Sequence, residues 1–218
     1  MIRDVDSYDW FTISLILIGF GLVFLKRLNK PKYNKYFQLL YTKTYFKAKL
    51  KETRYISLFE NIAFILANIV AAQLVYIFMM EKEAPELFFS EALLNLLSVF
   101  MIISLFFFIK YHFEKLINFC YHNHEFLNMY LFFKQVIWSY AVFLSLPFLI
   151  FFIYFPDSNI NFLYVTLGVS AVYFIINIFY FLYKNRSFAI RNWYYFILYL
   201  CALEIAPYYF LYNLFVIE

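Results

Sequence analysis

Glycine and histidine are scarce in this sequence, which has three of each among 218 residues. It contains no glycine-rich loop of the kind that cradles phosphates in nucleotide-binding proteins. It has no HExxH motif, and no histidine lies in a predicted span, so an intramembrane protease would lack its general base or its metal ligands. These absences argue against enzymes with a glycine-rich phosphate loop and against intramembrane proteases of the Ser–His or metal–His type.

Charge is also sparse, at 15% of the residues, whereas 65% are hydrophobic and the mean hydropathy is +0.70. A soluble domain of this length could not bury so much apolar surface. The apolar runs are long and unbroken rather than alternating, which favours helices over a β-barrel. We therefore predict one all-α integral membrane domain over residues 1–218. About six transmembrane helices are expected, over residues 10–25, 56–80, 92–109, 129–155, 160–183 and 192–217.

The segment over residues 26–54 carries ten Lys or Arg residues and one acid, Glu52. Apolar and aromatic residues recur in it from Tyr33 to Ala48 with the spacing of a helix. This pattern predicts a basic amphipathic interfacial helix over about 33–50, with a solvated basic loop as the alternative. Anionic lipid headgroups are its expected partner, and nucleic acid is not. The lysines expected to contact lipid are Lys35, Lys43, Lys47 and Lys49.

Sixteen of the 18 Lys and Arg residues fall on one side of the predicted topology. Lys110, Lys115 and Lys134 are among them, and Glu114 is one of the few acids on that side. The positive-inside rule then predicts that both termini face away from the cytoplasm, which in a bacterial inner membrane is the periplasm.

The second predicted span has small residues at helical spacing, which allow another helix to approach closely. They are Ala63, Ala67 and Ala71. Asn68 adds a polar group nearby. Glu60 lies six residues after Arg54, so it is either an intramembrane functional residue or a shallow acid paired with a cation of the loop.

The last predicted span contains Glu204, with about 20 Å of helix on either side. Pro207 has no N–H, so it frees the carbonyl of Leu203. An acid near mid-membrane is typical of proton relays and ion-coupled transporters. It also suits a structural hydrogen bond, or an ion pair with the membrane helix of another subunit.

Ligand-type side chains for zinc occur together between the third and fourth spans, at Cys120, His122 and His124. Their spacing on a continuous helix would point the two histidines in different directions. A solvated turn is favoured over a metal site, and we expect no metal and no cofactor.

The Asp9-Trp10-Phe11-Thr12 opening and the stretch from Leu198 to Pro207, which contains Leu-Glu-Ile-Ala-Pro, resemble an uncharacterised family. It comprises polytopic inner-membrane proteins of Bacteroidota with a domain of unknown function. The resemblance implies a bacterial inner-membrane protein and supplies no catalytic residues.

Short loops and small or polar helix faces favour a non-catalytic subunit or assembly factor of a cell-envelope complex, such as the secretion and gliding machinery. Other membrane subunits are then the expected partners. The alternative is a small proton- or ion-coupled transporter centred on Glu204, and an enzyme acting on a lipid ranks third.

Overall fold

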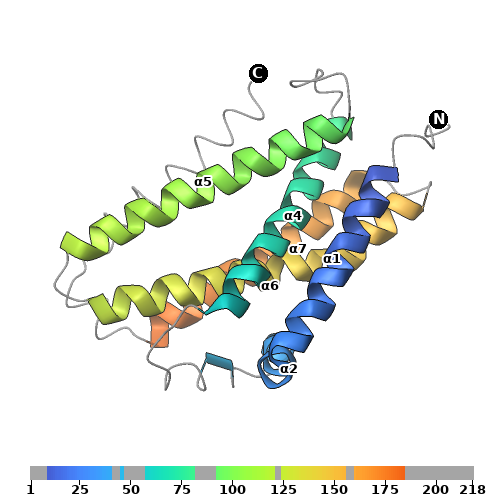
Figure 1. Cartoon of the computed structure of the whole chain (residues 1–218). Helices are drawn as coiled ribbons and strands as arrows, with labels where there is room; N and C mark the ends of the chain where they lie inside the picture. The colour runs from blue at the N-terminus through green and yellow to red at the C-terminus, as the bar shows by residue number, and fades with distance from the viewer. Residues whose placement is uncertain are drawn as a thin grey trace.

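The computed structural model describes residues 9–40, 45–46, 57–81, 92–120, 124–155 and 160–184. All regular structure in these ranges is helical (Figure 1). The elements are α1 (Asp9–Leu28), α2 (Lys30–Phe37), the 3₁₀ turn η2 (Gln38–Leu40), α4 (Leu58–Glu81), α5 (Ala92–Cys120), α6 (His124–Tyr154) and α7 (Ile160–Lys184).

Five of these helices, α1, α4, α5, α6 and α7, are long and apolar enough to cross a membrane. This confirms the prediction of an all-α, multi-pass membrane protein. The sixth predicted span, over residues 192–217, lies outside the described residues. At 29 and 31 residues, α5 and α6 are each about 45 Å long, so they exceed a hydrocarbon core of about 30 Å.

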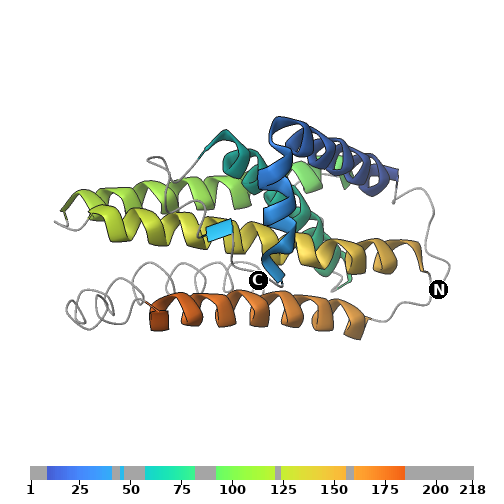
Figure 2. The ribbon, with the colours of Figure 1, turned by 90° about the horizontal axis from the view of Figure 1, so that it is seen from below.

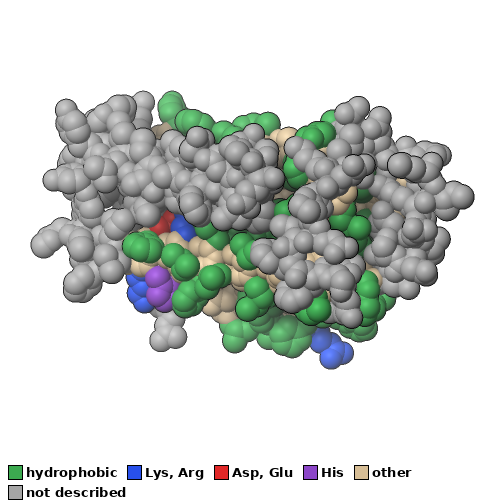
Figure 3. All heavy atoms as spheres, turned by 90° about the horizontal axis from the view of Figure 1, so that it is seen from above, with side chains coloured by type: hydrophobic (Ala, Val, Ile, Leu, Met, Phe, Trp, Pro, Cys, Tyr) green, Lys and Arg blue, Asp and Glu red, His purple; other side chains and the backbone are tan. Residues whose placement is uncertain are grey.

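Helices α4 and α6 form the centre of the bundle, with α1 and α5 packed against α4, and α7 packed against α6 (Figure 1). Of the most apolar window in each helix, 67% is buried in α4 and 61% in α6, against 11% in α7. The outer helices therefore present most of their surface to the surroundings. In the view of Figure 3, hydrophobic side chains cover most of the described surface.

The small residues of the second span face this centre. Ala63, Ala67 and Ala71 are all buried, in a cluster that includes Ile18 of α1 and Val136 of α6. Alanines in this position bring the backbone of α4 close to its neighbours, which is how small residues strengthen helix packing in a membrane.

The basic segment differs from the single helix expected over 33–50. The side chain of Asn29 caps α2 by accepting from the Lys32 N–H at 3.0 Å, and α2 ends at Phe37. The carbonyl of Phe37 accepts the hydroxyl of Tyr140 at 3.3 Å, and the chain continues as a 3₁₀ turn. In the described residues the α-helix thus covers only the first part of the predicted range, and residues 41–44 and 47–50 of that range lie outside the described residues.

Burial of Tyr36 turns α2 toward the protein rather than the lipid surface. This side chain is 1% exposed, and Figure 2 shows α2 crossing the bundle at a steep angle to α1. Lys35 is exposed in the last turn of α2. The other lysines expected to contact lipid, Lys43, Lys47 and Lys49, lie outside the described residues.

Gly21 of α1 lies against the Leu66 side chain of α4. A Cβ added there would lie 2.5 Å from the Leu66 side chain, whereas one added at Gly19 would meet nothing within 4 Å. We expect Gly21→Leu to lower the free energy of unfolding by about 1–3 kcal/mol more than Gly19→Leu, because only the first overpacks a buried contact. Both changes alter helix propensity equally, so thermal unfolding in detergent isolates the packing effect. Equal losses in the two variants would contradict close packing at this point.

Candidate functional site

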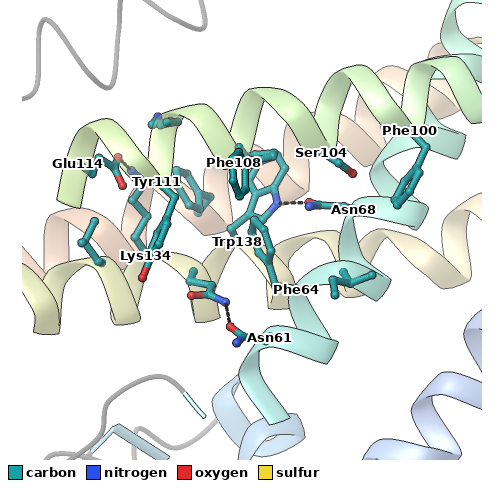
Figure 4. Close-up of a pocket in the computed structure, with 16 residues that line it drawn as sticks. Asn61, Phe64, Asn68, Phe100, Ser104, Phe108, Tyr111, Glu114, Lys134 and Trp138 are labelled. Atoms are coloured by element: carbon teal, nitrogen blue, oxygen red, sulfur yellow. Dashed lines mark hydrogen bonds and ion pairs between the residues drawn. The ribbon is translucent and has the colours of Figure 1, made fainter. Parts of the chain in front are cut away.

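A cavity of about 340 Å³ lies between α4, α5 and α6, with Phe174 of α7 completing its wall. Its size is at the lower end of ordinary ligand pockets, about 300–1,000 Å³. Its lining changes along its length from charged to polar to aromatic (Figure 4). This gradient makes it the strongest candidate for a functional site in the described part of the chain.

Three ionisable side chains form the charged end. Lys110 and Glu114 stand one turn apart on α5, and Lys134 of α6 forms an ion pair with Glu114. Their exposed fractions are 4%, 5% and 8%. Lys110 precedes the end of α5 by ten residues, and Lys134 follows the start of α6 by ten, so the group lies about 15 Å from the turn that joins these helices.

Amides and an indole line the middle of the cavity. Trp138 Nε1 donates to Asn68 Oδ1 at 3.4 Å, and Gln135 Nε2 donates to Asn61 Oδ1 at 3.4 Å (Figure 4). Gln135 Nε2 also lies 3.4 Å from the carbonyl oxygen of Glu60. These bonds are long against the usual N–H···O distance of about 2.9–3.0 Å. They are therefore weak, and a ligand group could replace them at small cost.

Aromatic rings close the inner part of the cavity. Phe107 of α5 packs edge-on against Phe64 of α4, with ring centroids 5.4 Å apart, and lies 5.1 Å from Trp138. Trp138 in turn packs edge-on against Phe174 at 5.9 Å. These contacts bring α4, α5, α6 and α7 together around an apolar wall. Edge-to-face pairs are a favourable geometry for aromatic rings, so they stabilise this arrangement.

Glu60 lies beside the cavity and belongs to the start of α4. Its Oε2 accepts from the Ser57 N–H at 2.7 Å and from the Ser57 hydroxyl, and its Oε1 accepts from the Tyr45 hydroxyl at 2.7 Å. A Ser at the cap whose N–H is bound by a Glu three residues later is a capping box. Glu60 therefore fixes the beginning of α4 and ties the segment around Tyr45 to it.

We expect Glu60→Ala to lower the free energy of unfolding by about 2 kcal/mol or more, because it removes a helix cap and the carboxylate that accepts from the buried Tyr45 hydroxyl. Tyr45→Phe removes only the hydrogen bond from the Tyr45 hydroxyl to Glu60, so its loss in free energy of unfolding is expected to be smaller. Glu60→Gln keeps an acceptor oxygen, and its loss is expected to lie between those of the other two variants. Thermal unfolding of the three variants in one detergent gives the order. An effect of Glu60→Ala no larger than that of Tyr45→Phe would contradict the capping role.

Comparison with known proteins places this cavity in a shared domain. Residues 11–215 match the family model described as Domain of unknown function (DUF4271). The chain belongs to this family. No curated protein and no solved structure matches it. The DUF4271 domain spans α1 to α7 and so contains every residue that lines the cavity.

The sequence-predicted site residues of this DUF4271 protein fall in different places. Asn68 lines the cavity, and Glu60 stands at its edge as a cap. Glu204 and Pro207 lie outside the described residues, as do the side chains of Cys120, His122 and His124. Among the side chains that the structure describes, no group of three His, Cys, Asp or Glu residues could hold a metal ion.

Sequence reasoning missed the ion pair between Glu114 and Lys134. It treated Lys134 as one of many positive charges on one side, although this residue lies within the predicted span over 129–155. An ionisable residue inside a span is itself a signal of function. The four-residue spacing of Lys110 and Glu114 along a continuing helical pattern is a second signal.

Proposed function

We propose that this protein is a non-catalytic polytopic subunit or assembly factor of a cell-envelope complex in the inner membrane of Bacteroidota. The observation that carries the proposal is the outward face of α7. That face combines β-branched residues with a glycine.

The outward face of α7 carries β-branched residues and a glycine over part of its length, followed by large aromatic residues, of which Phe179 is 67% and Tyr183 72% exposed. Val165, Val172 and Ile176 are 60%, 55% and 61% exposed, and Gly168 lies among them with nothing within 4 Å of an added Cβ. β-branched residues lose little side-chain freedom on packing, and glycine permits close approach of a second helix. The face therefore suits a helix of a partner protein.

The outward face of α5 provides the contrast. Its exposed residues are long and flexible, and they recur at helical spacing. They are Leu97, Met101, Leu105 and Phe108. Such side chains suit fluid lipid, so the partner is expected on α7 rather than on α5.

The proposed orientation rests on charge. The basic residues Lys26 and Arg27 end α1, and Lys184 ends α7, at the same end of the bundle as α2 and the start of α4. By the positive-inside rule this end would face the cytoplasm, and both termini would then face the periplasm.

The proposal is tested by purifying the tagged protein from its native membrane in mild detergent and measuring co-purified proteins by quantitative mass spectrometry. A stoichiometric membrane partner is expected with the wild type and with Gly19→Leu, and its loss is expected with Gly168→Leu. Both variants place the same side chain at an exposed glycine, so the difference isolates the α7 face. A protein that purifies alone in all three forms would overturn the proposal.

The second candidate is the ion-coupled transporter. The burial of Lys134 and Glu114 at the charged end of a cavity in a membrane domain favours it, because such residues mark proton and ion paths. It predicts proton flux in proteoliposomes that Glu204→Gln abolishes at equal protein level. No flux from the wild type would remove this candidate.

A further inference from the structure

Two hydrogen-bond donors in the middle of the cavity are unused. Asn68 is 3% exposed and its Oδ1 accepts from Trp138, but its Nδ2 donates no hydrogen bond within the described part of the chain. Among the same residues, the Ser104 hydroxyl also makes none. Figure 4 shows these two side chains on the facing helices α4 and α5, beside the Trp138 indole. A buried donor without an acceptor is costly, so this part of the cavity favours a ligand oxygen.

Both donors lie near the middle of their membrane spans. Asn68 follows the start of the span Leu58–Met80 by ten residues and precedes its end by twelve, and Ser104 lies ten and eleven residues from the ends of Leu94–Lys115. A hydrocarbon core is about 30 Å thick, so mid-span groups lie about 15 Å from either headgroup region. The ester and phosphate groups of a glycerolipid stay at the interface and would not reach them. The acceptor therefore belongs to a neutral molecule that dissolves in the hydrocarbon.

Aromatic rings surround these donors. Phe64 of α4, Phe107 of α5 and Trp138 of α6 line the cavity, and the rings of the last two have centroids 5.1 Å apart. Phe100, one turn before Ser104 on α5, also lines it. Aromatic side chains pair with a flat ring through offset stacking or edge-to-face contacts. The wall therefore suits a planar head better than a flexible acyl chain.

The cavity opens toward the surrounding lipid. Ile65 of α4 and Phe108 and Tyr111 of α5 line it, and they are 52%, 60% and 40% exposed. The volume of about 340 Å³ lies at the lower end of the range of ligand pockets, so it takes a small ring and not a long tail. A tail would leave through this opening into the bilayer. The ligand can thus enter and leave without crossing water.

We propose that the cavity binds an isoprenoid quinone from the hydrocarbon core of the membrane. A quinone is neutral and planar, and its carbonyl oxygens are acceptors for the Asn68 amide and the Ser104 hydroxyl. Its ring lies against Trp138, and its isoprenoid tail passes Phe108 into the bilayer. A neutral ligand also leaves the ion pair at the charged end of the cavity intact.

Trp138 reports on binding, because a quinone in contact with an indole quenches its fluorescence. The full-length protein, with Trp10→Phe and Trp193→Phe, is placed in nanodiscs of one lipid composition and titrated with a naphthoquinone that carries a geranylgeranyl tail. Quenching is expected to saturate, over a linear part that comes from quinone dissolved in the bilayer. Ser104→Phe fills the cavity and is expected to leave only the linear part. A purely linear response in the unsubstituted cavity, or saturable quenching that survives Ser104→Phe, would overturn the proposal.

Ser104→Ala removes one donor and is expected to weaken the saturable binding about fivefold, the effect of one hydrogen bond. Ser98→Ala is the matched control, because Ser98 lies on the same helix but does not line the cavity, and its hydroxyl donates to the Asn95 carbonyl. This control is expected to bind the quinone as the unsubstituted cavity does. Equal affinities in the two alanine variants would overturn the proposed site, and this comparison serves if Ser104→Phe does not fold.

Geranylgeraniol separates recognition of the ring from recognition of the tail. This alcohol has the same tail and a neutral oxygen, but it has no flat ring. At equal amounts in the bilayer it is expected to leave the saturable quenching by the quinone nearly unchanged. Full displacement by the alcohol would show that the site recognises the tail and would overturn the quinone proposal.

Discussion

Glu114→Gln is expected to destabilise the bundle by about 3–5 kcal/mol, the usual cost of removing one partner of a buried ion pair. The side chain of Glu114 is 5% exposed, and that of its partner Lys134 is 10% exposed. The substitution leaves Lys134 charged and buried, with Lys110 nearby on the same side of the cavity. The loss therefore measures the cost of burying the Lys134 charge without the Glu114 carboxylate more than the strength of the pair itself.

The double variant Glu114→Gln/Lys134→Met is expected to recover most of this loss, because it removes both charges together. The double-mutant cycle compares the wild type, Glu114→Gln, Lys134→Met and the double variant. Their unfolding is measured in one detergent by tryptophan fluorescence. Lys115→Gln is the control, and as an exposed change on the same helix it is expected to stay within about 0.5 kcal/mol of the wild type. Additive losses would contradict a direct coupling between Glu114 and Lys134.

Tyr36→Ala is the second large expected effect, at about 3–5 kcal/mol, because it empties a fully buried aromatic site. The Tyr36 ring packs edge-on against Tyr45 at 5.7 Å, Phe59 at 5.8 Å, Tyr140 at 5.8 Å and Phe143 at 6.5 Å. It thus joins α2 to α4, to α6 and to the segment around Tyr45.

Tyr36→Phe is the matched control. The Tyr36 hydroxyl is buried and makes no hydrogen bond of good geometry within the described part of the chain, so its removal is expected to be neutral or slightly stabilising. Thermal unfolding of both variants gives the comparison. A loss in Tyr36→Phe as large as that in Tyr36→Ala would show that the hydroxyl, rather than the ring, holds α2.

The pH dependence of this contact has a definite sign. Burial raises the pKa of Tyr36 well above its usual value of 10.0, since the ionised phenolate is disfavoured away from water. The unfolded chain therefore loses this proton first as the pH rises, and the stability that the contact contributes is present below about pH 10 and is lost above it. Tyr36→Phe is expected to lessen the alkaline loss of stability.

The spans could be predicted because they depend on local composition alone. A run such as Leu58 to Met80 is long, apolar and bounded by charges, so no knowledge of its neighbours is needed. The end of α2 could not be found in this way. At that end the carbonyl of Phe37 accepts a hydrogen bond from Tyr140, which lies more than a hundred residues away.

The cavity was only partly predictable. Asn68 and Glu60 stand out as polar residues in or near an apolar run, and the Ser57-x-x-Glu60 spacing carries the signal of a cap. The pairing of Glu114 with Lys134 depends on how two long helices are rotated about their axes, which composition does not determine. The sequence also did not indicate which contacts Glu60 makes. In the structure they are those of a helix cap.

Photo-cross-linking in the native membrane tests the proposed subunit role most directly. A benzoylphenylalanine placed at Val172 on the outward face of α7 is compared with one at Met101 on the outward face of α5. The side chains at the two sites are 55% and 65% exposed, so a cross-linker at either site can reach a neighbouring molecule. A discrete adduct with another membrane protein is expected from position 172 and not from position 101. No protein adduct from position 172, or the same adducts from both, would contradict a partner interface on α7.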